Sequence, residues 1–132
     1  MGLYQKSEIL EDIAVKVINE YDNFGHLRDG KCRIGYQYAE GTKTSSGRVV
    51  YADTEKVKDK YKEFMPYDFV ITFYEGNTCN LGDDVIEHLM YHELKHVGYD
   101  PKEEKFTIIP HDLEDFKDVV QKWGVDWIGG EV

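Results

Sequence analysis

Two histidines that are four residues apart, His92 and His96, flank a glutamate, Glu93, in the run His92-Glu93-Leu94-Lys95-His96. In a helix, residues at this spacing lie on one face, so both imidazoles can bind one ion, and Glu93 lies beside the open coordination position. A zinc ion lowers the pKa of its water to about 7, and a carboxylate can take the proton and pass it to a leaving amine. The sequence therefore predicts hydrolysis of peptide bonds, with Zn2+ as cofactor and Glu93 as general base.

Catalytic zinc normally takes three protein ligands and leaves the fourth position to water, so a third ligand must follow the motif. We favour His111, because Pro110 precedes it and a helix is expected to begin at Asp112, which would hold its side chain at a rigid junction. Mn, Fe or Co also suit histidine ligands, so the native ion stays open. The candidates for the third ligand are Asp100, Glu103, Glu104, His111, Asp112, Glu114 and Asp115.

The remaining histidines and both cysteines are given other roles. His88 lies four residues before His92, and at about 1.5 Å rise per residue it is roughly 12 Å from His96, too far to share an ion with it. We expect His88 on the helix surface or as a support to the ligands, and His26 on the chain surface. Cys32 and Cys79 have no CxxC spacing and are interpreted as packing residues.

A donor to the developing oxyanion would assist the reaction, and a tyrosine hydroxyl could serve. Tyr74, Tyr91 and Tyr99 are candidates, and the sequence does not select among them. For each, the alternative is packing or surface exposure, which is the usual role of a tyrosine.

The motif lies in the strongest predicted helix, from Asp83 to Val97. Asp83 and Asp84 favour its positive N-terminal end, and Gly98 is interpreted as its C-terminal stop. The histidines should lie at the margin of the apolar sector, where a cleft would be, with Glu87, Tyr91 and Lys95 facing away. That sector consists of Ile86, Leu89, Met90, Leu94 and Val97.

Other elements are expected around this helix in the order α-β-β-α-β-α-β-α. Apolar spacing predicts a first helix from Ser7 to about Tyr21, with Ser7 as N-cap. The remaining expectations are a hairpin of strands 33–39 and 49–51, a short helix 54–64, a buried strand 67–74 ending in a turn at 75–77, a strand 105–109 and an amphipathic helix 113–123.

Length and composition indicate one globular domain over residues 1–132. Hydrophobic residues make up 41% of the chain, so its formal charge of -10 does not imply disorder. This acidity argues against direct nucleic-acid binding, which depends on neutralising phosphates. The sequence contains neither an apolar run long enough to span a bilayer nor a secretory signal, and we expect a soluble cytoplasmic protein.

The motif and the residues after it resemble a known family, the phage metallopeptidase domain, which is similar to SprT-like zinc metalloproteases. The resemblance lies in the runs His92 to Gly98 and Ile109 to Phe116, and it ends near Trp123-Gly124. In SprT-like proteins, a histidine ahead of a later helix with an aromatic residue supplies the third ligand, and His111 and Phe116 match that pattern.

The resemblance implies a compact zincin-like α+β fold, in which a small, mainly antiparallel sheet packs against the HExxH helix and flanking helices. It also implies phage or prophage origin, location in the host cytoplasm, and a peptide or protein substrate. Oligomeric state and substrate identity stay open.

Two other classes of function remain as alternatives. A non-catalytic, zinc-stabilised interaction module would use the same ligands, and Asp115 could close its site as a fourth. Glu93 argues against it, because a structural site needs no adjacent carboxylate. A nucleic-acid mimic is suggested by the net charge alone, and the interspersed acids and lysines of Glu55 to Glu63 are typical of an ordinary solvated surface.

Overall fold

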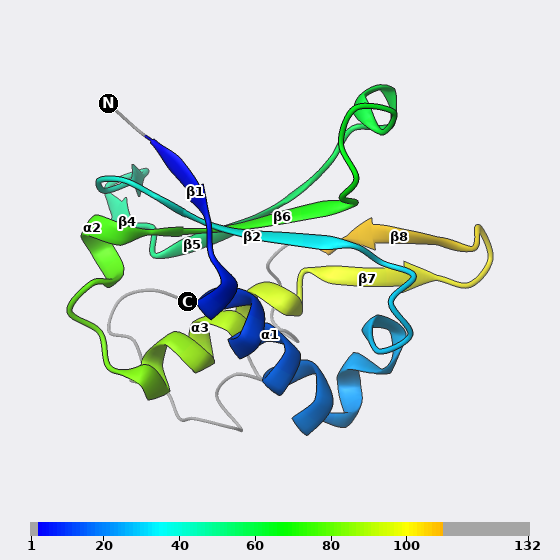
Figure 1. Ribbon diagram of the computed structural model, residues 1–132, viewed down its shortest axis with the longest axis horizontal. Helices are drawn as coiled ribbons and strands as arrows, with labels where there is room; N and C mark the ends of the chain where they lie inside the picture. The colour runs from blue at the N-terminus through cyan, green and yellow to red at the C-terminus, as the bar shows by residue number, and fades with distance from the viewer. Residues whose placement is uncertain (1–2, 110–132) are drawn as a thin grey trace.

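The computed structural model describes residues 3–109, in which two helices cover one face of a four-stranded sheet (Figure 1). The strand order is β1-β2-β6-β5. Strands β1 (Tyr4–Lys6) and β5 (Ala52–Lys56) form the two edges and run antiparallel to their neighbours. The central strands β2 (Ile34–Ala39) and β6 (Phe69–Tyr74) are parallel.

Two small hairpins lie outside this sheet. Strand β3 (Thr44–Ser45) pairs with β4 (Arg48–Val49), and β7 (Val97–Asp100) pairs with β8 (Lys105–Ile108), both antiparallel. The sheets are therefore mainly antiparallel, and the predicted α+β fold class is confirmed. The helices are α1 (Glu8–Glu20), the 3-10 helices η1 (Asp22–Leu27) and η2 (Asp59–Tyr61), the short α2 (Glu75–Thr78), and α3 (Asp83–Leu94).

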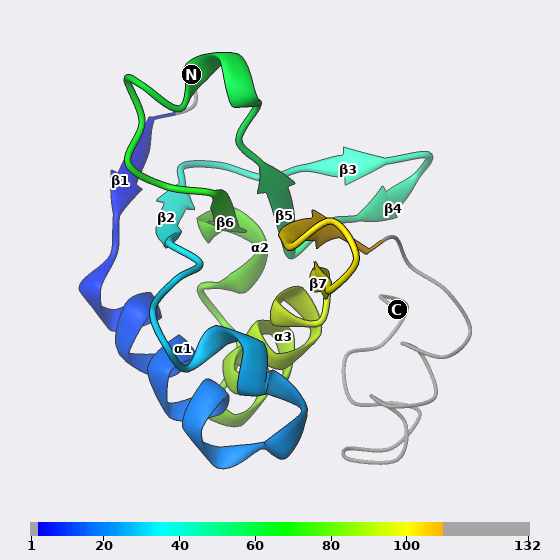
Figure 2. The same ribbon diagram turned by 90° about the vertical axis from the view of Figure 1, so that its right-hand side faces the viewer.

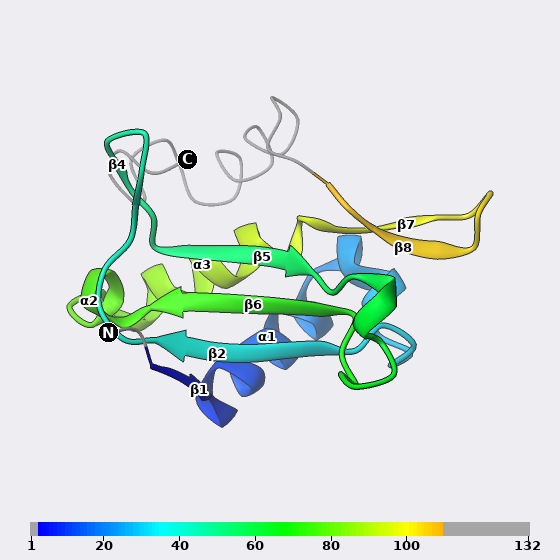
Figure 3. The same cartoon turned by 90° about the horizontal axis from the view of Figure 1, so that it is seen from above.

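The core lies between the sheet and helices α1 and α3, which run beneath it in the view from above (Figure 3). Alternate residues of β6 face the helices, because successive side chains of a strand point to opposite faces. The buried side chains of this layer are Leu10, Ala14 and Val17 of α1, Phe69, Ile71 and Phe73 of β6, and Leu89, Met90 and Leu94 of α3.

Helix α1 forms as predicted. Its buried residues Leu10, Ala14 and Val17 recur at helical spacing, and the Ser7 hydroxyl caps its start by accepting a hydrogen bond from the Leu10 backbone N–H at 3.1 Å. Strand β6 is likewise confirmed, beginning at Phe69. No helix within residues 3–109 combines the length and hydropathy needed to cross a bilayer.

Three predicted elements are wrong. The expected helix 54–64 is strand β5 followed by η2. Strand β2 pairs with β1 and β6 rather than with residues 49–51, because the intervening chain makes its own hairpin, β3–β4. Residues 75–77, expected as a turn, begin the short helix α2. The expected helix 113–123 lies outside the described residues.

Candidate metal centre and substrate groove

Helix α3 positions the first two residues of the motif. It begins after Gly82, with Asp83 and Asp84 in its first turn, where carboxylates favour the positive end of the helix dipole. It ends at Leu94, so His92 and Glu93 lie in its last turn. The helix is shorter than predicted, and Gly98 is not its C-terminal stop. Gly98 lies in β7, where an added Cβ would come within 2.4 Å of the Ile109 side chain.

His96 follows the helix and is held by the end of β8. The Ile109 N–H donates to the His96 carbonyl at 2.7 Å, and His96 Nδ1 lies 2.5 Å from the Ile109 carbonyl oxygen. A carbonyl only accepts, so this contact requires the proton on Nδ1 and leaves the lone pair on Nε2. Metal-binding histidines commonly have this arrangement, in which the second ring nitrogen donates to a backbone carbonyl.

His92, Glu93 and His96 form one buried cluster. One ligand atom of each lies within 4.8 Å of those of the others, and the residues are 2%, 3% and 7% exposed respectively. The two imidazole rings are 5.1 Å apart and nearly perpendicular, at 87°. Two imidazoles and a carboxylate at this separation suit a divalent ion such as Zn2+. The donor set therefore fits a metal ion.

Thr54 of strand β5 holds the Glu93 side chain. Its hydroxyl oxygen lies 2.8 Å from Glu93 Oε1 and 3.1 Å from the Glu93 carbonyl oxygen, and its proton can be donated to one of them at a time. Thr54 was not predicted as a site residue, because its segment was expected to form a short helix. No motif marks it, and only a correct assignment of β5 would have placed it above α3.

A groove of about 420 Å³ opens beside the cluster. Glu93 and His96 line it from α3 and the turn that follows. Its other walls come from β5, from the chain around the β3–β4 hairpin, and from the end of β8: Lys43, Ser45, Val50, Ala52, Asp53, Thr54, Ile108 and Ile109. The His92-Glu93-His96 cluster is thus reached from a cleft through Glu93 and His96.

The edge of β5 that faces this groove can pair with another strand. Tyr51 accepts from Tyr74 N–H at 3.0 Å and Val57 donates to Asp68 at 2.9 Å, so the odd-numbered residues direct their backbone groups at β6. By alternation, Ala52 and Thr54 direct theirs away from β6. No strand within residues 3–109 pairs with that side of β5.

Residues 3–131 match the model of a family described as "Putative phage metallopeptidase". The chain belongs to this family. Membership implies a metal ion and the hydrolysis of peptide or protein substrates, in agreement with the His-Glu-His cluster. Comparison with curated proteins and with solved structures gave no match.

The third ligand favoured from the sequence, His111, lies outside the described residues, as do Asp112, Glu114 and Asp115. Of the described candidates, Asp100 accepts from the Lys102 N–H at 2.9 Å and so stabilises the β7–β8 turn. Glu103 and Glu104 are exposed in that turn. Within residues 3–109, the group of side chains that could hold a metal ion contains none of these three.

The other two described histidines, His26 and His88, are not part of the cluster. His88 is half-buried one turn before His92, and burial lowers its pKa, opposed by Asp84 and Glu87. His26 is also half-buried rather than at the surface, and its Nε2 lies 2.7 Å from the Val97 carbonyl oxygen. His26 therefore links η1 to the start of β7, just after the motif.

The tyrosine candidates do not line the groove. Tyr91, expected to face away from the core, is fully buried against Tyr21 and Phe24, and its hydroxyl accepts from Asn23 at 3.0 Å. Tyr99 is partly exposed on β7. Tyr74 comes closest, since its hydroxyl donates to the groove residue Asp53 at 2.7 Å.

The two cysteines differ. Cys32 is buried in the core as predicted, and burial raises the pKa of its thiol to about 12. Cys79 is exposed, so its interpretation as a packing residue is wrong.

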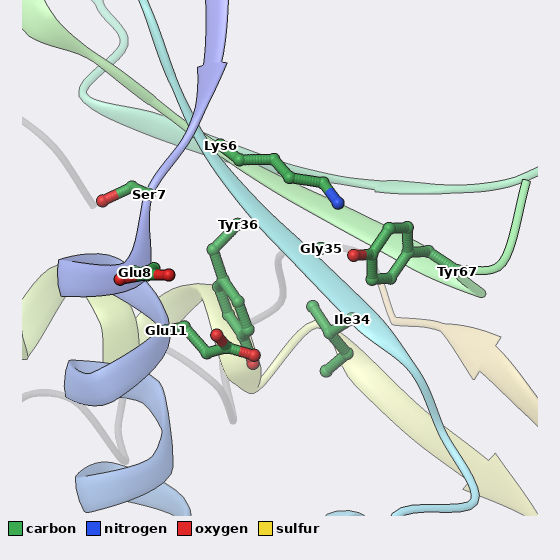
Figure 4. A pocket seen from close by; sticks show the side chains of 8 residues that line it. All are labelled: Lys6, Ser7, Glu8, Glu11, Ile34, Gly35, Tyr36 and Tyr67. Atoms are coloured by element: carbon green, nitrogen blue, oxygen red, sulfur yellow. The ribbon is translucent and has the colours of Figure 1, made fainter.

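A second hollow, of about 190 Å³, lies at the opposite edge of the sheet, between β1, α1 and β2 (Figure 4). There the Lys6 ammonium lies 5.1 Å from the centre of the Tyr67 ring, while Glu8 and Glu11 line the helix side. None of His92, Glu93 and His96 lines this hollow, whereas Glu93 and His96 line the groove beside β5, which is therefore the candidate active site.

Proposed function

We propose that this protein is a zinc-dependent peptidase that uses Glu93 as general base and His92, His96 and His111 as metal ligands. The observation that carries the proposal is the buried His92-Glu93-His96 cluster, which lies beside a groove at the edge of β5 with which no strand within residues 3–109 pairs. Family membership supports the same chemistry.

Chain connectivity supports His111 as the third ligand. Ile109 is hydrogen-bonded to His96 through both its N–H and its carbonyl oxygen. His111 follows two residues later in the sequence, and two residues of extended chain span at most about 7 Å, so the length of the chain permits His111 to share an ion with His96.

A bound zinc ion would supply Lewis acidity, which polarises a carbonyl and makes water acidic enough to attack it near neutral pH. Glu93 lies beside the two histidines and accepts the proton of the attacking water. It then donates that proton to the amine that leaves. Thr54 keeps the Glu93 carboxylate oriented during both transfers, because its hydroxyl lies 2.8 Å from Oε1.

The groove favours an extended peptide as substrate. The outward N–H and C=O groups of Ala52 and Thr54 can pair with a peptide backbone laid along β5, as strands do when they add to a sheet edge. Such a peptide would pass directly beside Glu93 and His96, which line the same groove.

Metal content and hydrolysis test the proposal together. Elemental mass spectrometry of the untagged protein should find about one zinc per chain, and His92→Ala and His111→Ala should each lose most of it. His88→Ala is the matched control, since it removes a histidine from the same helix outside the cluster, and it should retain zinc.

Hydrolysis is then measured on an unfolded protein substrate. We expect wild-type cleavage, its loss on chelation, and its loss in Glu93→Gln with zinc content unchanged. A protein that binds no zinc when zinc is supplied would refute the metal site. Zinc binding without hydrolysis of any substrate would instead favour the non-catalytic, zinc-stabilised module.

A further inference from the structure

Residues 43–50, here called the hairpin arm, project from the β5 side of the sheet (Figures 2 and 3). The arm contains β3 and β4, joined by a two-residue turn at Ser46 and Gly47 with φ of 52° and 77°. Positive φ at both positions is typical of the turns that match the twist of a hairpin. Residues 44–49 are all exposed. An isolated two-stranded ribbon is only marginally stable, so the orientation of this arm depends on its base.

One side chain, Asn77 of helix α2, holds both ends of that base. Its Nδ2 group donates to the Lys43 carbonyl oxygen at 3.1 Å and to the Val50 carbonyl oxygen at 2.9 Å. These two residues also pair directly, since the Val50 N–H donates to the same Lys43 carbonyl at 2.9 Å. A single amide thus bridges the two strands where they leave the sheet.

The neighbouring residue brings the backbones of α2 and the chain before the arm into close contact. The Gly76 N–H donates to the Gly41 carbonyl oxygen at 2.7 Å. A Cβ at position 76 would lie only 2.6 Å from that oxygen and 2.6 Å from Thr42 Cγ2. Glycine is therefore required for the base of the arm to lie this close to α2.

The Lys43 side chain anchors the arm to the outer face of β5. Its ammonium lies 2.7 Å from Asp53 Oδ2 and 3.3 Å from the Tyr74 hydroxyl, and the Tyr74 hydroxyl donates to the same carboxylate oxygen at 2.7 Å. The hydrogen bond to Asp53 is the main reason that the pKa of Lys43 is raised, so the ammonium stays charged. Backbone, amide and ion-pair contacts thus fix the arm at its base.

This anchored arm is a wall of the groove that contains Glu93 and His96. Lys43, Ser45 and Val50 line the groove, with Ile108 and Ile109 at the end of β8. Val50, Ala52, Ile108 and Ile109 give the groove an apolar part beside the metal-binding cluster. The wall is therefore suited to an extended chain that carries an apolar side chain near the reacting bond.

We infer that the hairpin arm binds the substrate, an extended segment of unfolded polypeptide with an apolar side chain, and that Asn77 is the positioning residue that holds the arm against the groove. This inference rests on the proposed peptidase function. Asn77 acts through the arm and lines neither the groove nor the metal-binding cluster, so its loss affects peptide binding rather than the metal.

Two hydroxamates separate these effects, because both chelate zinc but only one carries a peptide. Calorimetry on the zinc-loaded full-length protein compares acetohydroxamate with a hydroxamate joined to a leucine-rich tripeptide. The wild-type protein should bind the tripeptide hydroxamate more tightly than acetohydroxamate. In Asn77→Ala, which loses both hydrogen bonds that hold the base of the arm, the tripeptide probe should bind about tenfold more weakly, with acetohydroxamate unchanged.

Asn80→Ala is the matched control, since Asn80 is an exposed asparagine three residues further on, and it should bind both probes as wild type does. A shortened arm, with residues 44–49 replaced by two glycines, keeps Lys43, Val50 and Asn77 and should lose the same peptide-dependent affinity. If Asn77→Ala fails to fold, this second variant still tests whether the arm binds the peptide. A general loss of structure would weaken both probes and lower the zinc content, whereas misplacement of the arm weakens only the tripeptide probe.

The inference is overturned if the shortened arm binds the tripeptide probe as tightly as wild type, even where wild type hydrolyses peptides. If the tripeptide probe depends on the arm but no peptide is hydrolysed, the peptidase function fails and the arm remains a peptide-binding element. If the zinc-loaded wild type binds the tripeptide probe no more tightly than acetohydroxamate, the substrate-binding role of the arm is refuted, but the peptidase function is not. A protein that binds neither probe refutes both proposals.

Discussion

Replacing Thr54 with valine removes one hydroxyl and keeps the β-branched shape that suits strand β5. The lost group lies 2.8 Å from Glu93 Oε1. A hydrogen bond to a charged group contributes about 1.5–3 kcal/mol, and the lower end applies because water in the adjoining groove can replace part of it. If the loss of this hydrogen bond misorients the general base and raises the activation free energy by about 1.5 kcal/mol, kcat falls roughly tenfold.

The assay is kcat on a peptide that the wild type cleaves, with zinc content measured on the same samples. Thr54→Ser keeps the hydroxyl and should retain most of the rate. Thr72→Val is the matched control, because it removes a buried strand hydroxyl that accepts from Gln37 at 2.9 Å on the outer face of the sheet. Fully zinc-loaded Thr54→Val with the wild-type kcat would show that Thr54 does not orient Glu93.

Two further predictions concern stability. In Gly76→Ala, the new methyl group would lie 2.6 Å from the Gly41 carbonyl oxygen, so the free energy of unfolding in urea should fall by about 2 kcal/mol, whereas Gly25→Ala, with nothing within 4 Å, should change little. The pKa of Asp68 is lowered, because the Arg33 N–H and the Lys62 ammonium outweigh the opposing effect of burial. Asp68→Asn should therefore lower the melting temperature at pH 7, and this difference should disappear as the pH falls from about 4 through the lowered folded-state pKa. A difference that persists unchanged at pH 2 would contradict this assignment.

The sequence predicts best those elements that face the core. Helix α1 and strand β6 have apolar residues at the period of their own structure, because one face of each packs against the other. Strand β5 lacks this pattern. Its inward residues are the small Ala52, which packs in the core, and the polar Thr54, which contacts Glu93. Its outward residues include the charged Asp53 and Glu55. The strand was therefore mistaken for a polar helix because of its place in the site.

The site itself was predictable only where a short local pattern encodes it. The spacing of His92, Glu93 and His96 identifies the cluster, although the helix ends at Leu94. Two contacts with Ile109 keep His96 in place. They form because the β7–β8 hairpin returns the chain to the motif. The same holds for Thr54, which comes from a strand about forty residues earlier. Such long-range partners leave no periodic signal in a single sequence, and yet they would fix the orientation of the ligands and of the base on which the proposed catalysis depends.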